Sequence, residues 1–145
     1  MNEIRVKKLR VNAVLPTYGS AEAAGADLYA CLDEPMAILP GATVFIPTGI
    51  ALEVPRGCAG LVYARSSLGT KRGLAPANKV GVIDSDYRGE IFVALLNHGK
   101  ASQTIEPGER IAQFVITPVL TPKYIETDIL SDTDRGTGGF GSTGK

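Results

Sequence analysis

The strongest constraint on this chain is its punctuation, because glycine and proline interrupt every apolar run before it reaches helix length. Glycine and proline supply 17 and 9 of the 145 residues, and both disfavour helix interiors. The runs between them alternate or are rich in β-branched residues, which is typical of strands. We expect strands at residues 4–6, 9–13, 26–30, 36–39, 43–46, 48–54, 59–63, 80–83, 91–96, 111–116 and 119–129. Many short strands at turn-sized intervals predict an all-β barrel or sandwich.

Two segments depart from this pattern. Residues 66–77 are the one helix candidate, and Gly69, Gly73 and Pro76 keep it short. Residues 91–96 are apolar without alternation, so we expect a strand that is covered on both faces.

The composition changes after residue 132. Residues 135–144 contain five glycines, and Phe140 is their one large apolar side chain. Such a segment cannot bury enough surface to order itself. We therefore expect one domain over residues 1–132 and a flexible tail over residues 133–145. The tail is either a frayed end or a segment that wraps a phosphate, since Arg135, Ser142, Thr143 and glycine amides suit that task.

Charge and cysteine content exclude several classes of function. Fifteen basic and fifteen acidic residues cancel, so we expect no nucleic-acid partner. No apolar run approaches the roughly 20 residues of a membrane span, and no signal peptide is evident, so we expect no membrane partner. Cys31 and Cys58 have no metal-binding spacing, which indicates reduced thiols in a cytoplasmic protein and no zinc site.

Residues 81–92 contain the most informative local pattern. Two apolar runs, 80–83 and 91–96, flank a short polar turn closed by Gly89, which predicts a β-hairpin. Asp84 lies where the first strand ends, and Tyr87 lies inside the turn. The pair could form part of a site on a rigid stem, or Asp84 and Asp86 could simply stabilise the turn.

The other candidates are also open to two interpretations. Ser66 or Ser67, beside Arg65 at the start of the expected helix, is either an N-cap or part of an anion site. Strand alternation places Gln113 on one face with residues 111 and 115, where its amide either bonds the neighbouring backbone or faces a polar ligand. Asp27 is a turn acid or an outer partner of a bound cation. We expect Lys71, Arg72 and His98 to face solvent.

Five stretches in order resemble the trimeric dUTP diphosphatase (dUTPase) family. They are AGADL (24–28), ARSSLG (64–69), GVIDSDYRG (81–89), GERIAQ (108–113) and RGTGGFGSTG (135–144). The resemblance implies an all-β, jelly-roll-like subunit in a homotrimer with shared active sites. It implies Mg²⁺-assisted hydrolysis of dUTP to dUMP and pyrophosphate, which limits uracil incorporation into DNA and supplies dUMP for dTMP synthesis. Glu109 stands where the family often has aspartate, beside the chemistry.

The resemblance also implies roles for individual residues. Asp84 matches the aspartate that activates the attacking water, Tyr87 matches the tyrosine against the deoxyribose, and Asp27 matches a supporting position. The uracil pocket would be formed by Asn78, Gly81, Val82, Ile83 and Phe92. Phosphate binding would fall to Arg65, Ser66, Ser67 and Gln113, and tail closure to Arg135, Phe140, Gly141, Ser142 and Thr143. No residue matches a direct metal ligand, so Mg²⁺ would be held mainly by the triphosphate and waters.

Two alternatives remain open. A dCTP deaminase would need a glutamate as acid and base at cytosine, for which Glu90 is the weak candidate. A regulatory protein would bind dUTP without turnover. The complete glycine-rich tail together with Asp84, Tyr87 and Gln113 favours dUTP hydrolysis over both.

Overall fold

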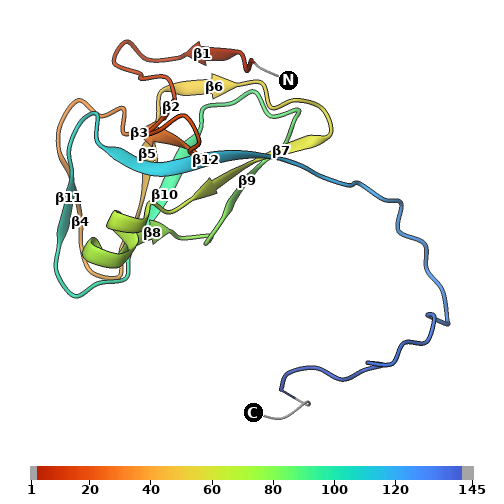
Figure 1. The fold of residues 1–145 in the computed structure, drawn as a ribbon. Coiled ribbons are helices and arrows are strands. Elements are labelled where there is room, and N and C mark those ends of the chain that lie inside the picture. Colours follow the sequence, from red (N-terminus) through yellow and green to blue (C-terminus); the bar gives the residue numbers. More distant parts are fainter. Residues whose placement is uncertain (1–2, 142–145) are drawn as a thin grey trace.

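The strands form four antiparallel sheets in the computed structural model, which describes residues 3–141 (Figure 1). The largest sheet has the order β2-β3-β12-β7-β9 and a second has the order β5-β10-β8. Two further pairs are β1 with β6 and β4 with β11. The prediction of an all-β, jelly-roll-like fold is confirmed. The bounds are β1 Val6–Lys8, β2 Thr17–Tyr18, β3 Ala26–Tyr29, β4 Met36–Ile38, β5 Thr43–Pro47, β6 Ile50–Leu52, β7 Cys58–Tyr63, β8 Leu74–Pro76, β9 Gly81–Ile83, β10 Phe92–Asn97, β11 Gln103–Ile105 and β12 Arg110–Pro118.

The core lies between the sheets and is made of aliphatic side chains. Members with less than 2% exposure include Leu28, Ile38, Ile46, Ile50, Leu74, Ile91, Val93, Leu95, Ile105 and Ile111. The turn between β5 and β6 requires glycine, because Gly49 has φ +70° and a Cβ there would lie 2.7 Å from Cys31 Sγ. Cys31 and Cys58 are both free thiols, as expected.

The helix is much shorter than predicted. Residues 66–72 are helical, with η1 (Leu68–Arg72) as their main turn, so the helix begins at the predicted residue and ends five residues earlier than the expected 66–77. Gly73, with φ +66°, ends it by donating its N–H to the Leu68 carbonyl. The next residues form β8, which pairs with β10, so tertiary pairing overrides local helix propensity.

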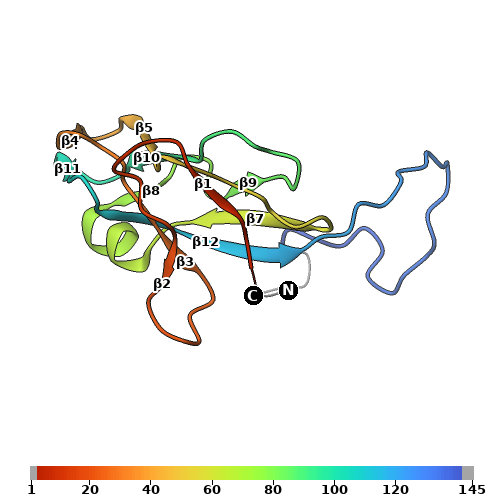
Figure 2. The same ribbon diagram turned by 90° about the horizontal axis from the view of Figure 1, so that it is seen from above.

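The predicted hairpin over residues 80–96 is wrong. β9 pairs with β7, with Val82 opposite Leu61, whereas β10 pairs with β5 and β8. The connection over residues 84–91 is longer than the about two to five residues of most hairpin loops. It therefore crosses from one sheet to the other, and the view from above in Figure 2 shows this separation.

Three smaller expectations also fail. In β10, Val93, Leu95 and Asn97 are buried while Phe92 is 45% exposed, so the strand is covered fully on one face only. Residues 9–13 form a turn rather than a strand. Residues 119–129 form no strand. The Val119 N–H donates to the Gly57 carbonyl at 2.9 Å, and beyond this bond the chain leaves the sheets (Figure 1).

Candidate functional site

The connection between the two sheets borders a hollow of about 210 Å³. β9 and its C-terminal end supply Val82, Ile83 and Asp84, while the start of β10 supplies Phe92. The remaining lining residues are Tyr87, Glu90 and Ile91. Four of the predicted nucleoside-site residues, together with Tyr87, therefore lie around one hollow. β9 and β10 do not pair with each other, which leaves room for a ligand between them.

The hollow distinguishes Asp84 from Asp86. Asp84 lines it and Asp86 does not. The Asp84 carboxylate is exposed, and no side-chain hydrogen bond or ion pair ties it to any residue in the described range 3–141. Its backbone carbonyl accepts the Tyr87 N–H at 3.2 Å, which closes the turn. The geometry leaves Asp84 free to accept a proton from a ligand or water in the hollow.

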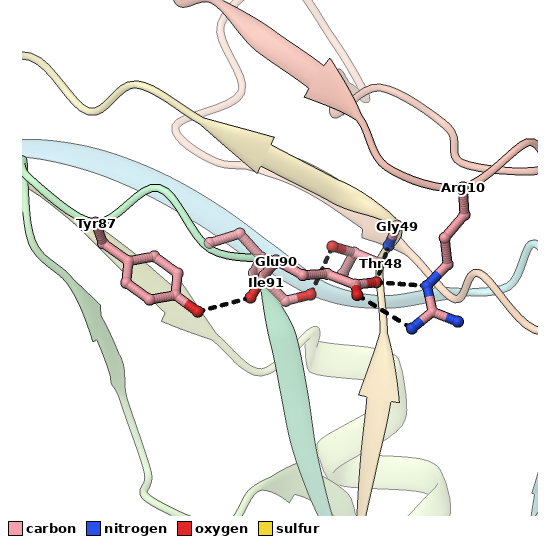
Figure 3. Close-up of polar contacts among 6 residues, drawn as sticks. All are labelled: Arg10, Thr48, Gly49, Tyr87, Glu90 and Ile91. Carbon is pink, nitrogen blue, oxygen red and sulfur yellow. Dashed lines mark hydrogen bonds and ion pairs between the residues drawn. The ribbon is translucent and has the colours of Figure 1, made fainter.

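Tyr87 is held against the backbone that follows it. Its Oη donates to the Glu90 carbonyl at 3.0 Å (Figure 3). The ring lies on Gly89, where a Cβ would come within 2.4 Å of Oη and 2.6 Å of Cζ. Glycine at position 89 is therefore a packing requirement of the Tyr87 ring.

Glu90 is engaged by two partners from distant parts of the chain. Its carboxylate accepts Arg10 Nε at 2.8 Å and Arg10 Nη2 at 3.1 Å. It also accepts the Gly49 N–H at 2.9 Å (Figure 3). The hydrogen bond to Glu90 raises the pKa of Arg10 above its ordinary value. A carboxylate fixed in this way is poorly suited to shuttle protons, which argues against the deaminase alternative.

A second cluster lies on the large sheet, with Asp27 at its centre. Asp27 is 9% exposed. It accepts Arg65 Nε at 2.8 Å and Arg110 Nη1 at 3.3 Å. Asp27 therefore holds two guanidinium groups, one of them Arg65, rather than closing a turn.

Gln113 lies opposite Asp27 across the β3–β12 pair. Its Nε2 donates to the Ala64 carbonyl at 2.9 Å, so its amide bonds the neighbouring backbone. Its Oε1 lies close to Gly25, where a Cβ would come within 2.8 Å. A register shift in β12 between residues 110 and 112 buries both Ile111 and Ala112, so simple alternation does not describe this strand.

Ser66 and Ser67 are exposed at the start of η1. The N-cap interpretation is wrong, because Ser67 is helical with φ −65° and its side chain makes no capping bond. Asn78 is exposed, and its Nδ2 would lie 3.6 Å from a Cβ at Gly81. It therefore lies beside the first residue of β9.

The two clusters are separate within one chain. Arg65, Ser66, Ser67 and Gln113 do not line the hollow. Antiparallel pairing places Gly81 opposite Val62 and Ile83 opposite Gly60. Arg65 follows β7 at the Gly81 end, whereas Asp84 lies at the other end of β9.

The described part of the tail, up to Gly141, does not line the hollow of its own chain. Arg135 donates from Nε to the Gly138 carbonyl at 2.8 Å, and Phe140 and Gly141 are exposed. Figure 1 shows the tail extending away from the sheets. Ser142 and Thr143 lie outside the described residues.

Sequence reasoning missed several contributors. Arg10 and Ile91 were not singled out, and Arg10 meets Glu90 across 80 residues without a local signal. The prediction that Arg72 faces solvent is wrong. It is half-buried and bonds Gln103, Glu109 and the Thr104 carbonyl. Glu109, the departure from the family pattern, thus anchors η1.

No helix in the described part of the chain is long and apolar enough to cross a membrane. Within residues 3–141, no three His, Cys, Asp or Glu side chains gather into a cation site.

Comparisons with known proteins agree with the motifs. The dUTPase family model matches residues 11–144. The chain is 51% identical to the deoxyuridine 5'-triphosphate nucleotidohydrolase of Desulfitobacterium hafniense, with 99% of each chain covered. It is 48% identical to that of Azoarcus sp., covering 100% of this chain and 99% of the relative. Among solved structures, a Staphylococcus bacteriophage 80alpha dUTPase variant with dUpNHpp has a TM-score of 0.92 at 29% identity, with both chains fully covered. A variant of the dUTPase from phage phi11 of S. aureus, described with a structural Mg(II) ion, shares the fold. Its TM-score is 0.82 at 24% identity, and the match covers 90% of this chain and 100% of that chain.

Proposed function

The chain belongs to the dUTPase family, and on that premise we propose that the hollow between β9 and β10 is its nucleoside site. The protein hydrolyses dUTP to dUMP and pyrophosphate. The observation that carries the assignment of the site is the hollow itself, which places the free carboxylate of Asp84 and the ring of Tyr87 around one space.

Asp84 is the proposed general base. Attack of water on the α-phosphorus requires a proton acceptor and an in-line approach. Asp84 follows directly on β9, which is paired to β7, so its carboxylate is attached to a rigid strand end. Asp84 would orient the water and take its proton, and the electron pair of the breaking P–O bond would leave with pyrophosphate.

Selectivity is proposed to arise from the walls of the hollow. Tyr87 packs against the deoxyribose and excludes a 2′-hydroxyl by contact. Backbone groups of Val82, Ile83 and Phe92, which line the hollow, would face the uracil edge. Gly81 and the amide of Asn78, which lie at the other end of β9 and do not line the hollow, would complete the uracil pocket. Cytosine would leave such polar groups unpaired, which gives strong discrimination.

The second cluster is proposed to bind the phosphates. Asp27 fixes Arg65 by a charged hydrogen bond, and the Ser66 and Ser67 hydroxyls and Gln113 complete the group. The one carboxylate of this cluster, Asp27, is engaged by Arg65 and Arg110, so a Mg²⁺ ion would arrive with the triphosphate, since Mg²⁺ commonly binds substrate phosphates and keeps several waters. When bound, it would supply neutralisation of phosphate charge.

We propose that the active protein is a homotrimer with shared sites. Two observations support sharing: the phosphate cluster does not line the hollow of its own chain, and the tail residues that the structure describes, 133–141, do not line it either. The segment between β12 and the tail also exposes Leu120, Tyr124, Ile125, Ile129 and Leu130 at 78–95%. Such apolar side chains suit contact with another copy. The tail would then bring Arg135, Phe140, Gly141, Ser142 and Thr143 to the nucleotide, with Phe140 over the base.

We place the enzyme in the cytoplasm, a proposal that the two free thiols support. There it would limit uracil incorporation into DNA and supply dUMP for dTMP synthesis.

The direct test is pyrophosphate release with Mg²⁺ from dUTP, dTTP, dCTP and UTP. Wild type should act selectively on dUTP, and Asp84→Asn should lose at least about 10²-fold in kcat. Asp86→Asn is the matched control and should retain activity. Equal loss in both variants would overturn the assignment of the base. Ammonia release from dCTP would indicate a deaminase, and dUTP binding without turnover would indicate a regulator.

A truncation tests the tail. Deleting residues 135–145 should leave the melting temperature unchanged. The described residues after Val119 make hydrogen bonds only among themselves and none to the sheets. Turnover should be largely abolished. Near-normal kcat in the truncated protein would refute the closing role.

A further inference from the structure

We propose that the Arg10–Glu90 ion pair is a positioning clamp that sets where Tyr87 stands, and through Tyr87 the preference for deoxyribose over ribose. This inference rests on the proposed role of Tyr87 against the sugar. Neither Arg10 nor Glu90 touches the sugar in this scheme. Each acts through the backbone that carries the tyrosine.

The first step concerns the attachment of Tyr87. Its hydroxyl donates to the Glu90 carbonyl at 3.0 Å, and its ring lies on Gly89. Both contacts involve the backbone of residues 89 and 90. The ring therefore follows any movement of the Gly89–Glu90 segment.

The second step concerns what holds Glu90. The next residue, Ile91, is 1% exposed and is fixed to the turn between β5 and β6. Its carbonyl accepts the Thr48 N–H at 3.1 Å and the Thr48 hydroxyl at 2.7 Å, and its own N–H donates to the Ile50 carbonyl at 2.9 Å. These bonds fix Ile91, and the bond of the Ile91 N–H also fixes the peptide plane that carries the Glu90 carbonyl. They do not restrain the torsions that join Glu90 to Gly89, on which the Tyr87 ring lies.

The Glu90 side chain removes that freedom. Its carboxylate receives two nitrogens of Arg10 and the Gly49 N–H, and its side chain is only 14% exposed. Two guanidinium bonds in parallel define a direction as well as a distance. Figure 3 shows Arg10 on one side of Glu90 and Tyr87 on the other.

The Arg10–Glu90 ion pair also neutralises a negative charge at the wall of the hollow. Glu90 lines the hollow, where the proposed substrate is a polyanion. An unpaired Glu90 carboxylate would add a second negative charge to that of Asp84 and so repel the nucleotide, and Arg10 neutralises the charge of Glu90. Loss of Arg10 should therefore weaken binding in addition to loosening Tyr87.

The experiment compares Arg10→Met and Glu90→Gln with a control pair. Arg5 and Glu53 also form an Arg–Glu ion pair near the N-terminal strand, at 3.6 Å with both side chains exposed, and they do not line the hollow. Arg5→Met and Glu53→Gln thus remove similar groups away from Tyr87. Glu90→Gln keeps one oxygen for the Gly49 N–H and Arg10 Nε, and it loses the charge together with the second oxygen, which accepts Arg10 Nη2.

Steady-state kinetics with dUTP and UTP give the first readout. For Arg10→Met we expect KM for dUTP to rise about 5-fold with kcat within about 2-fold, as for a lost positioning contact. The ratio of kcat/KM for dUTP over UTP should fall about 5-fold, by the same reasoning. Glu90→Gln should show a smaller change in the same direction. The double variant should be no worse than Arg10→Met, because the two residues act as one unit.

Hydrogen exchange gives a readout that needs no substrate. Amides of residues 85–90 should exchange faster in Arg10→Met than in wild type, while those of β7 and β12 remain unchanged. This result is independent of whether the chain hydrolyses dUTP. An unchanged dUTP-to-UTP ratio with unchanged exchange in the loop would overturn the clamp, as would equal effects in Arg5→Met. If Arg10→Met does not fold, Glu90→Gln alone decides by the same two readouts.

Discussion

A single methyl group at position 89 tests the packing of Tyr87 most directly. Gly89 does not have positive φ, so alanine carries no backbone penalty there. The Cβ of alanine would lie 2.4 Å from Tyr87 Oη, 2.6 Å from Cζ and 3.0 Å from Cε2, whereas ordinary contact begins at 3.4 Å. The ring must therefore retreat by about 1 Å, the difference between 3.4 and 2.4 Å.

The cost should appear in catalysis rather than in folding. Tyr87 is 43% exposed, so the ring can move outward without disturbing the core. We expect the melting temperature of Gly89→Ala to fall by less than about 4 °C, the effect of less than 1 kcal/mol in a domain of this size. A displacement of about 1 Å at a positioning group can cost on the order of 10²-fold in rate. We therefore expect kcat/KM for dUTP to fall by about 10- to 100-fold, or ~1.4–2.7 kcal/mol.

The assay is initial-rate pyrophosphate release, with thermal melting on the same samples. Gly19→Ala is the matched control, because Gly19 lacks positive φ and a Cβ there would meet nothing within 4 Å. In a Tyr87→Ala background the Gly89→Ala change should have no further effect, since the clash is gone. The reasoning fails if Gly89→Ala retains kcat/KM within about 2-fold of wild type, or if its effect persists without the Tyr87 ring.

Three further predictions address the rest of the molecule. Asp27→Asn should raise KM for dUTP about 10-fold and destabilise the fold by about 1–3 kcal/mol, because the hydrogen bonds from Arg65 and Arg110 lose their charged acceptor. Steady-state kinetics measures KM, and urea unfolding measures the stability. An unchanged KM would contradict the role of Asp27 in holding Arg65. Gly25→Ala should displace the Gln113 amide, whose Oε1 would lie 2.8 Å from the new Cβ, and so raise KM while costing about 1–3 kcal/mol of stability; unchanged kinetics would count against phosphate binding by Gln113. Burial raises the pKa of the Cys31 thiol above its ordinary value of 9.0, so above pH 9.0 the unfolded chain releases a proton that the folded chain retains, and the free energy of unfolding falls as pH rises. Urea unfolding at about pH 8 and about pH 10 should show a smaller fall for Cys31→Ala than for wild type, and equal falls would contradict this assignment.

The sequence predicted the class of fold, and it singled out five residues that line the hollow, because both leave local patterns. Short runs rich in β-branched residues and broken by turn residues indicate strands, whichever partner strand each of them pairs with. Val82, Ile83 and Phe92 were also found locally, because they flank a polar turn with an aspartate and a tyrosine. Their proposed roles came from the family resemblance and remain predictions.

The errors have a common physical cause, which is that pairing partners lie far away in sequence. Nothing within residues 80–96 indicates that β9 joins β7 while β10 joins β5 and β8. Residues 74–76 directly follow helical residues and were predicted to continue the helix, but they form β8 and pair with β10. Arg10 and Glu90 meet only after the chain has folded, so no spacing rule could have found their contact. The apolar character of residues 119–129 predicted a strand, yet within the described chain they have no strand to pair with.

Because β9 and β10 belong to different sheets, heating should alter the hollow before it melts the strands. Asp84 is attached to the five-stranded sheet, while Phe92 belongs to the three-stranded sheet, and the two sheets share no strand pairing in the described residues. The width of the hollow therefore depends on the side-chain packing between the sheets and on the few backbone bonds that join them, such as the one from the Cys31 N–H to the Pro47 carbonyl. Warming that loosens this packing would alter the hollow before any strand separates. Inactivation should thus begin below the temperature at which β-structure is lost, and a nucleotide that touches both walls should narrow that interval.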